Sequence, residues 1–195
     1  MKTSFDESLA LRTRANALQQ QEALLPATGP AQIPDAVQVG RQIAELGALI
    51  RELGEEFSGR AAAQPAPGHA IRAAMAYAEA IGSLGEASAA LGTVAQQLGF
   101  LGKTTEIRHL PWAREGRKDA VRVIEDAVET ARDELRHGTR TLNQAAQHLS
   151  SPPGDLRRQA ALSRSATAAT PVPAELGGPA PAPAAAAAHA DRRLR

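Results

Sequence analysis

The chain has 195 residues and a formal net charge of +1 at pH 7, so its overall charge gives no reason to expect attraction to nucleic acid or to an anionic membrane. Hydrophobic residues make up 43% of the sequence, but 43 residues are alanine and only 3% are aromatic, which favours thin helix–helix interfaces over a deep ligand pocket. Cysteine is absent from the sequence, which excludes disulfides, cysteine-ligated zinc and a cysteine nucleophile.

The first predicted helix runs from about Ser4 to Leu25, and leucines recur along it at heptad spacing (Leu11, Leu18 and Leu25). Pro26 ends this helix, and residues 26–34 form a proline-rich loop. A second helix starts near Asp35, a residue type that caps helices well, and stops near Gly59. Its apolar residues alternate at spacings of three and four, which is typical of a seam packed against another helix. This seam consists of Ala36, Val39, Ile43, Leu46, Ile50, Leu53 and Phe57.

Two longer helices are predicted next. The third covers about residues 69–102, and the fourth starts between residues 111 and 119 and ends near residue 150, before two consecutive prolines. The seam of the third helix consists of Tyr77, Ile81, Leu84, Ser88, Leu91, Ala95 and Leu98. The seam of the fourth consists of Val121, Ile124, Val128, Ala131, Leu135, Gly138, Leu142, Ala145 and Leu149.

Leucine–glycine pairs recur every seven residues in the third helix, as Leu84-Gly85, Leu91-Gly92 and Leu98-Gly99. The second helix has two such pairs, and residues 43–54 (IAELGALIRELG) align with residues 81–92 (IGSLGEASAALG) as a weak internal repeat. Each glycine costs a helix about 1 kcal/mol relative to alanine. Because small residues beside a seam let two helices approach more closely than the usual 8–10 Å or so, we predict that these two helices form an antiparallel pair packed tightly along the glycine stripe. The alternative is that the glycines have no packing role.

The segment 102–118 holds the only tryptophan and an excess of basic residues. Trp112 either packs back on the bundle or belongs to a contact loop, since tryptophan and arginine are typical interface anchors. The candidate contacts to a nucleic-acid backbone are Lys103, Arg108, Arg114, Arg117 and Lys118. The sequence GKTT at 102–105 is not the end of a phosphate-binding loop, because residue 97 is glutamine where that motif requires glycine.

Two Glu-x-x-His patterns, Glu106 with His109 and Glu134 with His137, have the ligand spacing of di-metal sites in four-helix bundles. Both flank the apolar positions, and no inward-facing glutamate accompanies them. We therefore predict solvated helix surface and no metal site. Neither a Ser-His-Asp arrangement nor a dinucleotide fingerprint is present, so no catalytic residue, cofactor or small-molecule substrate is expected.

The expected fold class is all-α: an antiparallel bundle of three long heptad-patterned helices plus an N-terminal helix, followed by a disordered C-terminal tail. The expected divisions are residues 1–30 (N-terminal helix and loop), 31–150 (bundle) and 151–195 (tail). The tail holds seven of the 13 prolines and few large apolar residues, a composition that buries too little surface to fold. The pattern leaves open whether the first helix docks on its own bundle or exchanges between chains.

Two classes of function fit this organisation. The first is a non-enzymatic scaffold protein that binds a helical protein partner, or itself, through glycine-notched seams. Its expected interface consists of Leu84, Gly85, Leu91, Gly92, Leu98, Gly99 and Trp112. The alternative is a nucleic-acid accessory protein that uses the basic 103–118 segment and the tail. The first residues lack the apolar core of a secretory signal, and the longest uncharged stretch, residues 87–102, is too short to span a bilayer, so we expect a cytoplasmic protein without a membrane partner.

Overall fold

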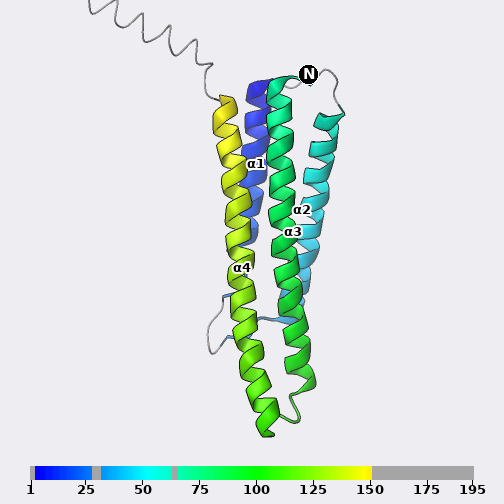
Figure 1. Cartoon of the computed structure of the whole chain (residues 1–195), viewed down its shortest axis with the longest axis vertical. Helices are drawn as coiled ribbons and strands as arrows, with labels where there is room; N and C mark the ends of the chain where they lie inside the picture. Colours follow the sequence, from blue (N-terminus) through cyan, green and yellow to red (C-terminus); the bar gives the residue numbers. More distant parts are fainter. Residues whose placement is uncertain (1–2, 28–31, 63–65, 151–195) are drawn as a thin grey trace, which may run out of the picture. The chain divides into compact units, whose positions relative to one another are not determined.

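The structure, a computed structural model, describes residues 3–27, 32–62 and 66–150. It is an all-α fold with the helices α1 (Ser4–Ala23), α2 (Ala36–Ala61), α3 (Gly68–Lys103) and α4 (Pro111–Ser150) (Figure 1). All four predicted helices are confirmed, and their ends lie within two residues of the predicted ones wherever a single end residue was predicted. The predicted tail, residues 151–195, lies outside the described residues.

Local capping explains where the first two helices begin. Thr3 and Asp6 form a capping box, in which each side chain accepts a hydrogen bond from the other residue's backbone N–H. At the start of α2, the carboxylate of Asp35 accepts a hydrogen bond from the backbone N–H of Val37 at 3.3 Å, as the sequence predicts. These caps satisfy backbone groups that have no partner within the helix.

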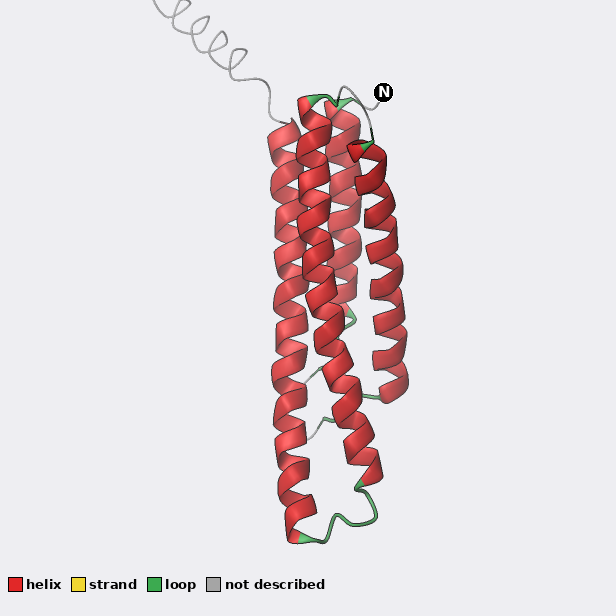
Figure 2. Cartoon of the chain, turned by 45° about the vertical axis from the view of Figure 1, so that its right-hand side comes forward, coloured by secondary structure: helices red, strands yellow, loops and turns green. Residues whose placement is uncertain are grey.

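Neighbouring helices run antiparallel, and α3 packs against both α2 and α4, while α1 packs mainly on α4 (Figures 1 and 2). The heptad leucines of α1 are all buried, which confirms the predicted stripe of that helix. The predicted seam of α4 is also confirmed, because most of its members are buried and Val121 and Ala145 are partly buried. Each helix therefore presents the apolar row that its periodicity predicts.

The burial pattern of α3 is wider than predicted. Tyr77, Leu84 and Leu91 of the predicted seam are buried, but Ala95 is exposed. A second buried row runs beside that seam and consists of Ala73, Ala80, Ala87, Val94 and Leu101. Two rows are needed because α3 has two neighbours, α2 on one side and α4 on the other. A single a/d seam describes a helix with one partner.

The N-terminal helix docks on α4 of its own chain. The hydroxyl of Ser4 donates to the carbonyl of Leu149 at 2.6 Å, and that of Ser8 donates to the carbonyl of Ala146 at 2.9 Å. These bonds place the start of α1 beside the end of α4. Further along, Arg136 of α4 pairs with Glu22 at 2.7 Å.

Polar side chains join α1 to α2. Arg14 binds Glu52, and the side chain of Gln42 donates to the carbonyl of Gln21 at 3.0 Å. Because α1 and α2 are shorter than α3 and α4, the α3–α4 hairpin extends beyond them at the end where α3 and α4 are connected (Figure 2). We call residues 103–122 of this hairpin the tip. Within the described ranges, no helix has both the length and the apolar character needed to cross a membrane.

Candidate interaction surfaces

The predicted close packing of α2 and α3 along the glycines is wrong. A Cβ atom added to Gly47 or Gly54 of α2, or to Gly85, Gly92 or Gly99 of α3, would have no neighbouring atom within 4 Å. The glycines lie beside the leucine rows on the side that faces away from the core. Their lack of a side chain therefore does not bring the two backbones together.

The close contact in this bundle occurs at Gly138 of α4. A Cβ atom there would lie 2.9 Å from Cδ2 of Leu18 and 3.5 Å from Cβ of Ser83. It would also lie 3.9 Å from the backbone Cα of Ala80. Gly138 thus lets α4 sit against α1 and α3 at once. The sequence places this glycine in the α4 seam but does not single it out from the glycines on other helices.

Two leucines of the predicted partner interface are core residues. Leu84 and Leu91 are each 0% exposed, and Leu98 is partly buried against the same core. Leu84 and Leu91 therefore pack within their own bundle and are not available to a partner, which corrects the expectation for these two positions. The glycines next to them, and Trp112, are the members of that set which reach the surface or come close to it.

Six glycines form one face of the α2–α3 pair, which we call the glycine face. It consists of Gly40, Gly47 and Gly54 of α2 and Gly85, Gly92 and Gly99 of α3. Each helix carries them at seven-residue spacing, so each set lies on one side of its helix. None of the six would bring an added Cβ within 4 Å of a neighbouring atom. Partly buried isoleucines lie next to them on the same side of the seam (Ile43, Ile50 and Ile81).

The glycines of the two helices stand opposite one another. The guanidinium of Arg60 lies over the ring of Tyr77, which fixes the register of antiparallel α2 and α3 near this point. Gly54 is six residues before Arg60 and Gly85 is eight residues after Tyr77, or about 9 and 12 Å along the axis at 1.5 Å per residue. The other two pairs follow at equal seven-residue steps. Three glycine pairs therefore repeat along the same face.

A buried ion pair links α1 to α2 near the start of α1. The side chains of Arg60 and Glu7 are 6% and 3% exposed, and Nε of Arg60 donates to Oε2 of Glu7 at 2.8 Å. Arg60 also binds the side chain and the carbonyl of Glu56. Burial by itself lowers the pKa of Arg60, but the bonds to Glu56 and Glu7 outweigh it and the pKa is raised. The sequence gives no sign that this arginine, among 19, is a core residue.

Tyr77 covers this ion pair from α3. Cζ of Arg60 is 4.6 Å from the centroid of the Tyr77 ring, which is a cation–π contact. Within the described residues, the tyrosine hydroxyl has no hydrogen-bond partner. Burial raises the pKa of Tyr77 to about 12, although the charge of Arg60 acts in the opposite direction.

Stability is expected to fall between about pH 10 and pH 12 because of Tyr77. Its pKa is about 12 in the folded protein against an ordinary 10.0, so the unfolded chain loses this proton first as the pH rises. The group's contribution is fully present below pH 10 and is lost through pH 12, by roughly 2–3 kcal/mol in total. Tyr77 is the only tyrosine, so phenolate absorbance reports it alone. A midpoint near 10 in the native protein would contradict this prediction, and Tyr77→Phe is the control that keeps the ring.

The basic segment divides into structural and exposed members. Arg117 is partly buried and donates to the carbonyl of Leu101 and to the hydroxyl of Thr104, at 2.5 and 3.0 Å, so it caps the end of α3. This role corrects the expectation that it contacts nucleic acid. Lys118 pairs with Glu115 at 3.2 Å on the surface. The remaining three expected contacts, Lys103, Arg108 and Arg114, are exposed.

Trp112 is 60% exposed on the first turn of α4. The interpretation in which it packs back on the bundle is therefore wrong. An exposed indole can stack on another flat group or fill a pocket of a partner. It lies beside the exposed cations of the tip.

The two Glu-x-x-His patterns lie in different surroundings. Glu106 and His109 are exposed in the connection between α3 and α4. His137 pairs with Glu79 of α3 at 3.4 Å, and Glu79 also accepts a hydrogen bond from Thr141 at 3.2 Å. In residues 3–27, 32–62 and 66–150, no three metal-ligating side chains gather at one point. The His137–Glu79 contact instead joins α3 to α4.

A surface hollow of about 450 Å³ lies between α3 and α4, near the end of α4. It is lined by Arg72, Met75, Ala76, Glu79, Thr141, Gln144, Ala145 and His148. No periodic pattern in the sequence predicts it, because its lining comes from the polar faces of two helices that meet only after folding. Compared with known proteins, the chain matches no family model, no curated protein and no solved structure.

Proposed function

We propose that the protein is a non-enzymatic interaction protein that self-associates through the glycine face. The observation that carries this proposal is that six helix-interior glycines face open space. Together they cost α2 and α3 about 5 kcal/mol relative to alanine, and no close contact within the chain offsets that cost. A helix laid against this face can approach its backbone closely, which would offset it.

The face is suited to a second copy of the chain. In α2 and α3 the same glycine spacing runs in opposite directions, so the face has an approximate two-fold symmetry. Two-fold dimers bury the same patch on both subunits, and such a patch must be self-complementary. The partly buried isoleucines beside the glycines supply apolar surface that a second copy would cover. A helix from another protein is the alternative occupant.

The test is the molar mass of the full chain in solution over a range of protein concentrations. We expect a dimer that dissociates on dilution. Replacing Gly47 and Gly92 together by glutamine places long side chains on the face. The variant is expected to be monomeric, yet no less stable as a monomer, because glutamine forms helices better than glycine and meets no neighbour.

Glutamine at Ala44 and Ala89 is the matched control. Both alanines are exposed and lie outside the glycine face, on the same two helices. This variant is expected to dimerise normally. A wild-type chain that is monomeric at every concentration would refute self-association, and an equal loss of dimer in both variants would refute the assignment to the glycine face.

A further inference from the structure

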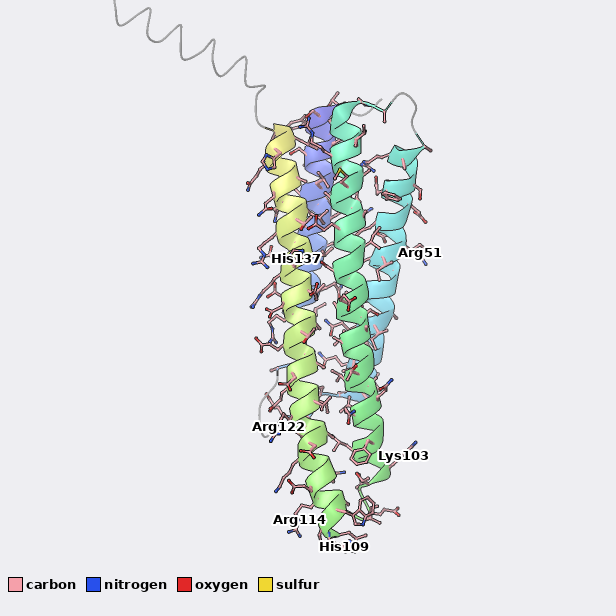
Figure 3. The ribbon with its side chains drawn as sticks, viewed as in Figure 1. Arg51, Lys103, His109, Arg114, Arg122 and His137 are labelled. Atoms are coloured by element: carbon pink, nitrogen blue, oxygen red, sulfur yellow. The ribbon has the colours of Figure 1, made fainter. Side chains whose placement is uncertain are left out.

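The tip differs in charge from the rest of the bundle. Residues 103–122 hold six lysines and arginines against three acidic residues, whereas residues 1–102 hold seven against ten. Figure 3 shows Lys103, His109 and Arg114 together at the end of the α3–α4 hairpin, with Arg122 further along α4. Arg51 and His137 lie well away from them. The near-neutral net charge of the chain therefore conceals a positive end.

A row of cations follows one face of α4. Arg114, Lys118 and Arg122 are four residues apart and all exposed, so they project from the same side at intervals of about 6 Å. Lys118 is paired with Glu115, but both side chains are about two-thirds exposed and such a pair contributes little. It can be exchanged for another anion at small cost.

Most cations of the tip are not engaged elsewhere. Within the described ranges, no hydrogen bond or ion pair holds the side chains of Lys103, Arg108, Arg114 and Arg122. Several arginines nearer the centre of the bundle do join helices, as Arg14, Arg60 and Arg136 show. The exposed cations of the tip are thus available to a ligand that carries several negative charges.

Trp112 adds an aromatic surface to these charges. It lies two residues before Arg114 and is the only large hydrophobic side chain of residues 103–122 that is strongly exposed. Membrane-surface helices bury a whole apolar face in the lipid, and one indole does not provide such a face. Exposed aromatic rings among cations are instead how proteins bind single-stranded nucleic acid, with bases stacked on rings and phosphates beside cations.

We propose that the tip binds single-stranded nucleic acid, with Trp112 stacking on a base and the Arg114–Lys118–Arg122 row, Lys103 and Arg108 neutralising phosphates. Arg117 is not part of this surface because it caps α3. The glycine face and the tip use different residues. Binding at the tip can therefore fail or succeed independently of self-association.

The test uses the full chain and a fluorescein-labelled single-stranded DNA oligonucleotide of mixed sequence. Fluorescence anisotropy of the label measures affinity, and tryptophan emission reports the tip alone because Trp112 is the only tryptophan. We expect Trp112 emission to be quenched on binding. We also expect the affinity to fall steeply as salt is raised.

The decisive variant replaces Arg114, Lys118 and Arg122 together by glutamine. We expect at least a tenfold loss of affinity at low salt, and a salt dependence shallower by about two units of log affinity per log salt, since each contact to a single strand contributes about 0.7. The matched control replaces three exposed arginines outside the tip by glutamine: Arg41, Arg51 and Arg140. It changes the net charge equally and leaves residues 151–195 intact.

The control variant is expected to bind as the wild-type chain does. An equal loss of affinity in the two variants would overturn the proposal, because it would show that only net charge matters. Binding without any change in Trp112 emission would also overturn it. So would the absence of binding at low salt, including the case in which the protein binds phosphatidylserine vesicles but not the oligonucleotide.

Discussion

Replacing Glu7 by alanine is expected to lower the free energy of unfolding by about 3 kcal/mol, measured by urea denaturation followed by circular dichroism. The change leaves the guanidinium of Arg60 buried without its partner on α1. The expected loss lies at the low end of the range for a broken buried pair, because Glu56 still binds Arg60. Since the pair joins α1 to α2, the variant is also expected to loosen α1.

Two further variants make this test specific. Glu55→Ala removes an exposed glutamate from the same region of α2 and is expected to change the stability by less than about 0.5 kcal/mol. Replacing Glu7 and Arg60 together by methionine removes both charges, and we expect most of the loss to be recovered. A Glu7→Ala variant as stable as the wild-type chain would show that this ion pair is solvated.

Leu84→Ala is expected to destabilise the protein by about 2–5 kcal/mol, through the lost burial of its side chain and the cavity left behind. Leu84 is fully buried between its own helices. The control is Leu9→Ala on α1, where the leucine is 57% exposed and the expected cost is below about 1 kcal/mol. Urea denaturation at a protein concentration where the chain is monomeric separates folding from association.

The Leu84 result distinguishes a core residue from an interface residue. The sequence places Leu84 and Gly85 together on an expected contact surface, but the structure assigns the leucine to the core and the glycine to open space. If Leu84 contacted a partner instead, its replacement would weaken association and leave the monomer nearly as stable as before. That outcome would require a different arrangement of α2 and α3.

The helices and most of their buried rows follow from the sequence alone. Helix ends are set by local groups, such as the Asp35 cap and the prolines, and the 3.6-residue period marks which side of each helix is apolar. In α4 this period identifies the buried row almost completely, because the opposite faces of α4 are charged. Where polar and apolar faces contrast strongly, periodicity is sufficient.

Only the tertiary structure decided which small and charged residues are enclosed. Ala80 of the second α3 row and Gly138 of α4 resemble many exposed alanines and glycines, and they become core positions only because a neighbouring helix covers them. In the same way, Arg60 is buried because Glu7 arrives from a helix 53 residues away in the chain, and Arg117 becomes a cap because it reaches the end of α3. Burial and charge pairing depend on contacts between distant segments, which a local periodicity does not encode.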